Sequence, residues 1–285
     1  MPNFPIVDTH LHVWDPGRLP YPWLDDIPFL NKPYLLEDYR RACGSVEIEK
    51  MVFVQAEVDF SHYQAETDWV TELSQQDSRL RGIVSWAPLE QGDGARSALE
   101  KLAGNPLVKS IRRIIQFEPD PDFCLRPDFI EGLQALPDYD LTFDICIAHV
   151  HMSNTLRMVA QCPDVAFILD HIGKPDIAAQ LFEPWKRELR QLAAFPNVWC
   201  KMSGLVTEAD HQHWQREELK PYIDHVLDCF GFDRTMYGGD WPVAYQATEY
   251  PRWVETLEWA VEGCSEDELK RLFRDNAIDF YRLTD

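Results

Sequence analysis

Three histidines and one aspartate stand at the ends of apolar runs in this sequence. His10 and His12 are two residues apart, and side chains at positions i and i+2 of a strand point to the same side. His171 ends a later run, and Asp240 follows two glycines that allow close backbone packing. Buried imidazoles need hydrogen-bond partners or a metal ion, and a carboxylate beside them can ligate a metal or act as a general base. Alone, His171 would indicate a core histidine and Asp240 a helix cap, but the four together predict a metal or oxyanion site.

Charged residues near the ends of other runs are candidate substrate contacts. Arg112 and Arg113 are adjacent, so strand alternation turns one of them inward, where it could hold a carbonyl or carboxylate or pair with an acid such as Asp144. Lys201 lies inside an apolar run, where a charge is costly unless it is paired. Glu208 falls in the loop after that run and could bind substrate hydroxyls, a metal or water.

Five further histidines carry weaker signals. His149 and His151 form a second His-x-His pair, in a stretch typical of a loop that enters a helix. They could contact a substrate or lie on the surface. His211, His213 and His225 lie in polar stretches, and we expect them to be solvated.

The elements that must position these residues are apolar runs that alternate with helix-like stretches. Several runs lack polar alternation, which is typical of strands buried on both faces of a parallel sheet. Eight strand–helix units fill the chain and predict one (β/α)8 barrel of the TIM type, as a single domain over residues 1–285. A doubly wound open sheet is the alternative, but no GxGxxG pattern follows the first run. The runs are Ile6–Trp14, Glu49–Glu57, Leu80–Leu89, Val108–Gln116, Leu141–Ala148, Val165–Gly173, Val198–Gly204 and Thr235–Val243.

Helix starts are indicated by short polar side chains. Capping-box patterns begin at Ser61 and Ser265. Ser153 or Asn154 could cap another helix. Pro221 falls early in a further helical stretch, where a first turn tolerates proline.

Residues 14–34 interrupt this alternation. They contain five prolines together with Trp23 and Phe29, a density that forbids a long regular helix. A long aromatic loop after the first strand should lie over the carboxyl end of the barrel, where such barrels do their chemistry. We expect either a lid over the site or a hydrophobic clamp on the barrel edge.

Composition excludes several classes of protein. The 285 residues include 27 basic and 48 acidic ones, a net charge of −21 that disfavours nucleic acid and anionic lipid as partners. A hydrophobic content of 45% is too high for a disordered chain. The sequence shows neither a signal peptide nor an apolar stretch of roughly 18 residues. Seven well-separated cysteines predict neither a disulfide framework nor a CxxC zinc site, so we expect a cytoplasmic protein.

Five motifs in order along the chain resemble the amidohydrolase superfamily, in particular its amidohydrolase-2 type sugar lactonases, such as fuconolactonase- and rhamnonolactonase-like enzymes. The motifs are VDTHLHVW from Val7, LDHIGKP from Leu169, CKMSGLVTEAD from Cys200, YGGDWPV from Tyr237 and NAIDFY from Asn276. The resemblance implies a deformed barrel with its site at the mouth. It maps the family's first-strand histidines onto His10 and His12, the sixth-strand histidine onto His171 and the eighth-strand aspartate onto Asp240.

One departure from the superfamily pattern concerns the metal. Where many members carry a bridging lysine or glutamate on strand four and a histidine on strand five, this chain has Arg112, and Ala148 before His149. The resemblance therefore implies one Zn²⁺ held by His10, His12, His171 and Asp240, or a metal-independent site, rather than two metals.

The implied function is hydrolysis of a sugar lactone to the sugar acid. Asp240 would activate water, and the three histidines would polarise the carbonyl directly or through one metal. Alternatives on the same barrel are a lactone isomerase, a pyrone-dicarboxylate-type lactonase, a decarboxylase or a non-catalytic barrel that binds sugar acids. The expected partner is a small-molecule lactone. The sequence leaves open whether the protein forms a homo-oligomer. The candidate substrate-binding residues are Arg112, Glu208, Trp241, Lys201 and His149.

Overall fold

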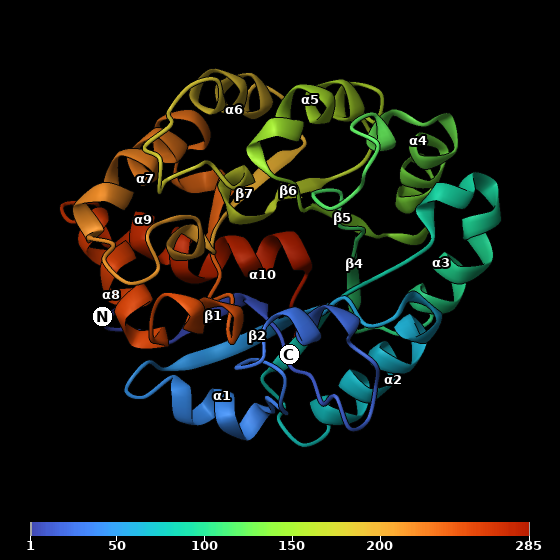
Figure 1. The fold of residues 1–285 in the computed structure, drawn as a ribbon, viewed down its shortest axis with the longest axis horizontal. Coiled ribbons are helices and arrows are strands. Elements are labelled where there is room, and N and C mark those ends of the chain that lie inside the picture. Colours follow the sequence, from blue (N-terminus) through green and yellow to red (C-terminus); the bar gives the residue numbers. More distant parts are fainter. Residues whose placement is uncertain (1, 285) are drawn as a thin grey trace.

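The computed structural model describes residues 2–284, and its centre is one sheet of eight parallel strands in the order β1 to β8, ringed by helices (Figure 1). This confirms the predicted (β/α)8 architecture. The strands are β1 (Ile6–Leu11), β2 (Ile48–Val54), β3 (Leu80–Ser85), β4 (Val108–Arg112), β5 (Thr142–Ile145), β6 (Phe167–Leu169), β7 (Val198–Met202) and β8 (Thr235–Tyr237). The helices are α1 (Leu36–Ala42), α2 (Tyr63–Ser74), α3 (Arg96–Ala103), α4 (Pro127–Gln134), α5 (Met152–Ala160), α6 (Trp185–Ala193), α7 (Arg216–Phe230), α8 (Tyr250–Ala260), α9 (Glu266–Lys270) and α10 (Asn276–Tyr281).

All eight strands were predicted, but each prediction ran past the carboxyl end of its strand. β8 ends at Tyr237, for example, whereas the apolar run continues to Val243. Most of the extra residues leave the sheet yet stay buried, as Ala87, Ile147 and Trp241 do, because the loops at the barrel mouth cover them. The apolar runs therefore predict which residues are buried, but they do not predict where the strand hydrogen bonds end.

The seam between β1 and β8 is closed by backbone bonds that involve residues following β8. The Asp240 amide donates to the carbonyl of His10 at 2.7 Å, and the His12 amide donates to the carbonyl of Trp241 at 2.8 Å. Asp8 adds a side-chain link, because its Oδ1 accepts from the Gly239 amide at 2.8 Å. A Cβ on Gly239 would lie 2.5 Å from that carboxylate, so this close approach requires glycine. The result is a nearly closed barrel that brings the first and last motifs together.

One of the predicted helix starts is confirmed and the others are wrong. Ser265 caps α9, with its Oγ accepting from the Glu268 amide. Ser61 does not cap α2: its own amide donates to Asp59, which caps a short 3-10 turn before the helix. α5 begins at Met152, so Ser153 and Asn154 lie inside its first turn.

Helix α7 corrects two further expectations. Pro221 lies inside the helix rather than in its first turn. His225 is buried rather than solvated, and its Nε2 lies 2.8 Å from the carbonyl of Lys186. Burial lowers the pKa of this imidazole. The buried neighbours Tyr222 and Val226 share its helix face, so helical periodicity carried the signal that the polar surroundings concealed.

Helix α10 lies across the centre of the ring of strands (Figure 1). Its Phe280 and Tyr281 belong to a buried cluster with Val7, Val52 and Ile168 from the strands. The strand starts are also covered from this side, because the Lys50 ammonium donates to the carbonyl of Leu283. α10 therefore plugs the barrel at the end opposite the mouth.

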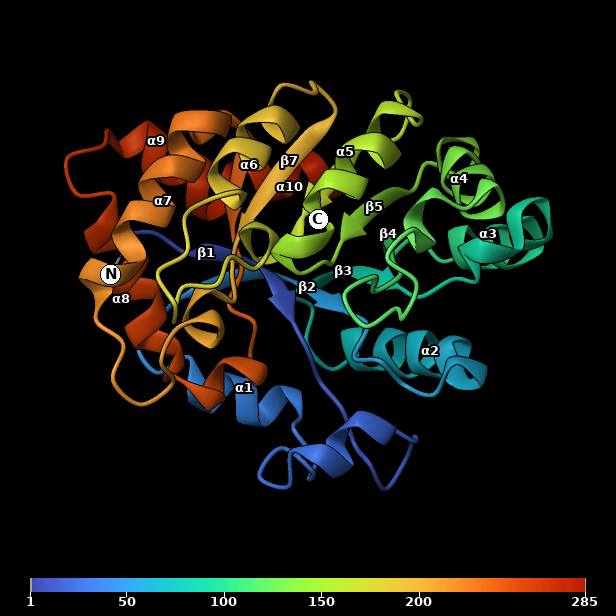
Figure 2. The ribbon, with the colours of Figure 1, turned by 45° about the horizontal axis from the view of Figure 1, so that its top comes forward.

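Residues 14–34 project beyond the end of the barrel at which β1 terminates (Figure 2). They contain only a short 3-10 helix, Pro22–Asp26. The indole of Trp23 donates to the carbonyl of Ala56 at 2.8 Å, which ties the segment to the end of β2. This is the position expected of a lid, and the segment forms one wall of the cavity described below.

All seven cysteines are free thiols. Among residues 2–284, no helix combines the length and the apolar character needed to cross a bilayer.

Candidate active site

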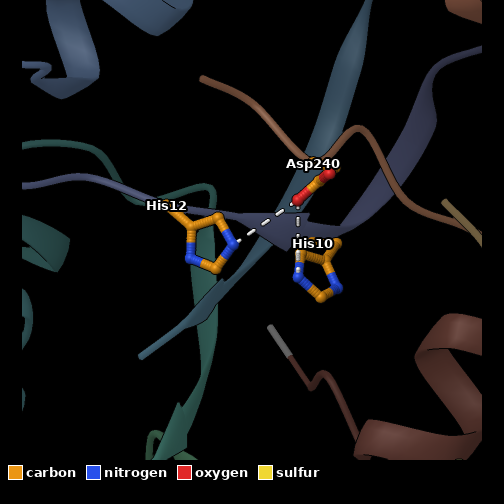
Figure 3. Close-up of side chains that lie close together, drawn as sticks. All are labelled: His10, His12 and Asp240. Atoms are coloured by element: carbon orange, nitrogen blue, oxygen red, sulfur yellow. Dashed lines mark ion pairs between the residues drawn. The ribbon is translucent and has the colours of Figure 1, made fainter. Parts of the chain in front are cut away.

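The mouth of the barrel brings His10, His12 and Asp240 together (Figure 3). Asp240 Oδ1 lies 3.6 Å from His12 Nε2 and 3.8 Å from His10 Nε2. The three residues come from the two strand ends that meet at the barrel seam, and all three are buried. Their ligand atoms lie within 4.8 Å of one another, so they could hold a metal ion.

The two β1 imidazoles are held differently. His12 Nδ1 lies 2.7 Å from the carbonyl of Val54, and donation there leaves its Nε2 lone pair aimed at Asp240, which is how metal-binding histidines are usually held. His10 Nδ1 faces Asp170 Oδ1 at 3.5 Å, but within residues 2–284 neither atom has a hydrogen-bond partner. Arg112 NH1 lies 3.2 Å from His10 Nε2, so the guanidinium competes for the lone pair of that nitrogen.

His171 completes the histidine cluster from the end of β6. Its ring centroid is 4.4 Å from that of His10, and its Nδ1 lies 2.9 Å from the hydroxyl of Ser203. With His10 and Asp170 it forms a second group of possible ligands. The structure thus brings together all four residues that the sequence singled out.

Electrostatics assign different protonation states to these groups. Burial lowers the pKa of His10 and of His171 well below the ordinary value, so both imidazoles are neutral at neutral pH. Burial alone would raise the pKa of Asp240, but neighbouring His171, His12 and Lys174 bring it below its ordinary value. Asp240 is therefore an ionised carboxylate that can accept a proton.

Of the two arginines at the end of β4, Arg112 turns into the site. Its NH2 donates to the carbonyl of Gln55 at 2.5 Å, and its NH1 lies 3.4 Å from Asp170 Oδ2. Arg113 points elsewhere and pairs with Glu90 and Glu118. The inward arginine was predicted to contact either the substrate or an inward acid. Arg112 lines the cavity, and it also pairs with an acid. That acid is Asp170 rather than Asp144.

Lys201 is not placed to touch a substrate, contrary to its predicted role. The side chain is fully buried, and its ammonium lies 2.6 Å from Asp144 Oδ2 and 2.9 Å from Asp170 Oδ1. Asp144 also accepts from the hydroxyls of Ser110 and Tyr281. Lys201 thus pairs with two buried carboxylates beneath the site, one of which faces His10.

Two other predicted substrate contacts also lie outside the cavity lining. Trp241 is buried against Tyr34, Tyr39 and Tyr245 beside the site. His149 is half-buried, and its Nδ1 lies 3.1 Å from the carbonyl of Lys174. Neither residue is among those that line the cavity.

The site opens into a cavity of about 400 Å³ at the barrel mouth. Glu208 lines it, as predicted, and so do several residues that the sequence did not single out. Its polar and aromatic lining includes Trp14, Trp23, Asp26, Glu57, Arg112, Gln116, Lys174, Glu208 and His211.

Four cavity residues have a left-handed backbone, which side-chain-bearing residues rarely adopt. They are Glu57 (φ 52°), His171 (φ 53°), Lys174 (φ 48°) and Asp240 (φ 53°). Such strain concentrates at functional sites, where the fold holds a side chain in one direction. Glu57 and Lys174 were missed as site residues. Glu57 ends the second predicted run, which is the sequence signal that could have found it.

A buried carboxyl supports the cavity wall near the lid. Glu66 on α2 accepts from the Ala56 amide at 3.2 Å, and burial raises its pKa to about 8. The folded protein therefore binds this proton more tightly than the unfolded chain, and the resulting stability is lost as pH rises from about 4.5 towards 8.

Glu66→Gln should remove this pH dependence. Relative to the native protein, the variant should gain up to about 1.4 kcal/mol of unfolding free energy per pH unit between pH 5 and pH 8. Urea denaturation of both proteins across that range measures the difference. Parallel stability–pH curves would show that Glu66 is already ionised in the fold.

An eight-stranded barrel with histidines and an ionised aspartate around a cavity at its mouth has the arrangement of a barrel enzyme. The family model described as Amidohydrolase matches residues 7–283, and the chain belongs to that family.

Relatives match over nearly the whole chain. L-fucono-1,5-lactonase from Burkholderia ambifaria is 31% identical over 285 residues, which cover 97% of this chain and 95% of that protein. L-rhamnono-gamma-lactonase from Scheffersomyces stipitis is 20% identical, with 99% and 100% covered. The crystal structure of an amidohydrolase from Burkholderia multivorans with bound zinc is 28% identical, covers 99% of this chain and 100% of its own, and has a TM-score of 0.88.

Proposed function

We propose that this protein is a lactonase that hydrolyses a sugar-derived lactone to the sugar acid. The observation that carries the proposal is Asp240, an ionised carboxylate held between His10 and His12 at the wall of a cavity. A carboxylate in that state can activate water. The relatives named as lactonases support the same reaction class.

The proton path follows from this geometry. Asp240 takes a proton from water, and the water oxygen forms a bond to the lactone carbonyl carbon. The bond from that carbon to the ring oxygen then breaks, and Asp240 returns its proton to the departing oxygen. The acid formed releases its own proton to solvent, which makes turnover visible as acidification.

The three imidazoles suit a cation better than a direct contact to the carbonyl. The Nε2 atoms of His10 and His12 lie 3.8 Å and 3.6 Å from Asp240 Oδ1, so these three residues can share one cation. We propose that these residues, with His171, hold one Zn²⁺. A bound divalent ion would polarise the carbonyl and lower the pKa of the attacking water.

The charges of the cavity favour a neutral substrate. Its carboxylates can accept hydrogen bonds from sugar hydroxyls. Arg112 already contacts Gln55 and Asp170, so few positive groups remain to bind the carboxylates of an anionic substrate. This favours a polyhydroxy lactone over a pyrone dicarboxylate. The charged lining residues are Asp26, Glu57, Glu208, Asp240, Arg112 and Lys174.

A panel of aldonolactone stereoisomers, followed by proton release with a pH indicator, tests the reaction. We expect acid formation with at least one neutral lactone. An isomerase releases no acid, and a binding protein shows saturation without turnover. Either result across the panel would overturn the proposal.

Metal removal tests the cation site separately. Exhaustive chelation should lower the lactonase rate at least about 100-fold, because Lewis-acid polarisation contributes several kcal/mol, and added Zn²⁺ should restore it. Elemental analysis before and after chelation checks the metal content. Full activity with no detectable metal would remove Zn²⁺ from the mechanism and leave the role of Asp240 intact.

A further inference from the structure

We propose that Lys174 and Glu208 together bind one ring hydroxyl of the lactone and so select which sugar lactone is accepted; this rests on the lactonase function proposed above. Both side chains line the cavity, Lys174 from the loop after β6 and Glu208 from a short 3-10 helix after β7. Lys174 is 19% exposed and Glu208 25% exposed. The pair is therefore accessible from the cavity while the protein shields most of its surface.

The distance between the two charged groups leaves room for a hydroxyl. Lys174 Nζ and Glu208 Oε1 are 3.9 Å apart, well beyond a charge-assisted hydrogen bond. An oxygen about 2.8 Å from each atom would form two such bonds at an angle of about 90°. A hydroxyl suits both ends, because it accepts from an ammonium and donates to a carboxylate.

The hydrogen-bonding capacity of this pair is not used by the protein. Within residues 2–284, neither the Lys174 ammonium nor the Glu208 carboxylate has a hydrogen-bond partner, and their mutual contact is an ion pair alone. Arg112 differs, because both of its terminal nitrogens already contact protein acceptors. Lys174 and Glu208 are thus free to receive a polar ligand group.

Backbone hydrogen bonds hold Lys174 and Glu208 in position. The Lys174 carbonyl accepts from the His149 amide at 3.3 Å, and Lys174 itself has a left-handed φ of 48°. The Glu208 carbonyl accepts from the Ala178 amide at 2.9 Å. Lys174, Glu208 and Asp240 all line the same cavity, so a substrate in it would lie within reach of both the pair and the carboxylate.

Substrate analogues separate hydroxyl recognition from a general structural effect. We would measure kcat/KM of the native enzyme, Lys174→Met, Glu208→Gln and the double variant on the best lactone and on its monodeoxy analogues. Each single variant should lose roughly 10- to 100-fold on the parent lactone, as expected for a hydrogen bond to a charged group. On the analogue that lacks the bound hydroxyl, the loss should shrink to about 3-fold or less, because the contact is already absent. Lys220→Met, which breaks an exposed pair with Asp224 on α7, is the matched control.

Binding of the corresponding sugar lactams, measured by titration calorimetry on the same variants, needs no turnover. Hydroxyl-dependent loss of lactam binding supports the pair even if every lactone proves inert, and in that case the lactonase function alone fails. Two results would overturn the assignment of Lys174 and Glu208. One is an equal loss of kcat/KM or of lactam binding on the parent compound and on all its analogues. The other is no loss in either the kinetic or the binding experiment.

Discussion

Asp240→Asn should lower kcat for lactone hydrolysis by roughly 10²- to 10⁴-fold, the usual contribution of a general base. The amide keeps the size of the carboxylate and can still accept a hydrogen bond, but it cannot take a proton from water at neutral pH. Because Asp240 contacts His10 and His12, and the proposed hydroxyl contacts belong to other residues, KM should change far less than kcat. Steady-state proton release on the best lactone of the panel measures both constants.

Asp228→Asn is the matched control, since it removes an exposed acid from α7, remote from the cavity. It should keep native kinetics. Thermal unfolding of both variants checks that the fold is retained. A folded Asp240→Asn protein with a near-native rate would mean that another group activates the water.

Lys201→Met should destabilise the protein by about 3–5 kcal/mol, the range observed when one partner of a buried ion pair is removed. The ammonium lies between Asp144 and Asp170, and it is fully buried. Burial opposes ionisation of Asp170, yet Lys201 and His10 hold its pKa well below the ordinary value. Without the lysine, Asp144 would keep only its neutral hydroxyl donors and Asp170 only Arg112, so the buried cluster would carry excess negative charge. Urea denaturation measures the lost free energy.

A double variant distinguishes lost pairing from lost packing. Lys201→Met combined with Asp144→Asn removes one positive and one negative charge, so it should recover part of the stability lost in the single variant. Arg18→Met, at an exposed ion pair with Glu72, should change stability by no more than about 1 kcal/mol. If the double variant were no more stable than Lys201→Met alone, charge balance would not be the reason for the lysine.

The core of the site was predictable because a parallel barrel gathers its strand ends on one face. His10, His12, His171 and Asp240 each lie near the carboxyl end of a buried run, so knowing the architecture was enough to bring them together. The same logic would have found Glu57, which ends the second predicted run.

Other roles depend on partners that lie on different strands. Lys201 meets Asp144 from β5 and Asp170 after β6, and nothing in the spacing along the chain shows that these three share one layer of the barrel. Lys174 enters the cavity through a left-handed backbone that its residue type does not favour. Trp241 follows Asp240 directly, but it packs against tyrosines beside the site, because the backbone turns between the two residues.

The plug formed by α10 has a consequence for biosynthesis. Tyr281 donates to Asp144 at 2.8 Å, and with Phe280 it packs against residues from β1, β2 and β6. During translation all eight strands leave the ribosome before this helix does. Until then Asp144 lacks one of its hydrogen-bond donors, and the interior around Val52 and Ile168 is open to water. The nascent chain therefore completes its barrel only after residue 281 has emerged, and chaperones that bind exposed apolar surface have this whole interval in which to act.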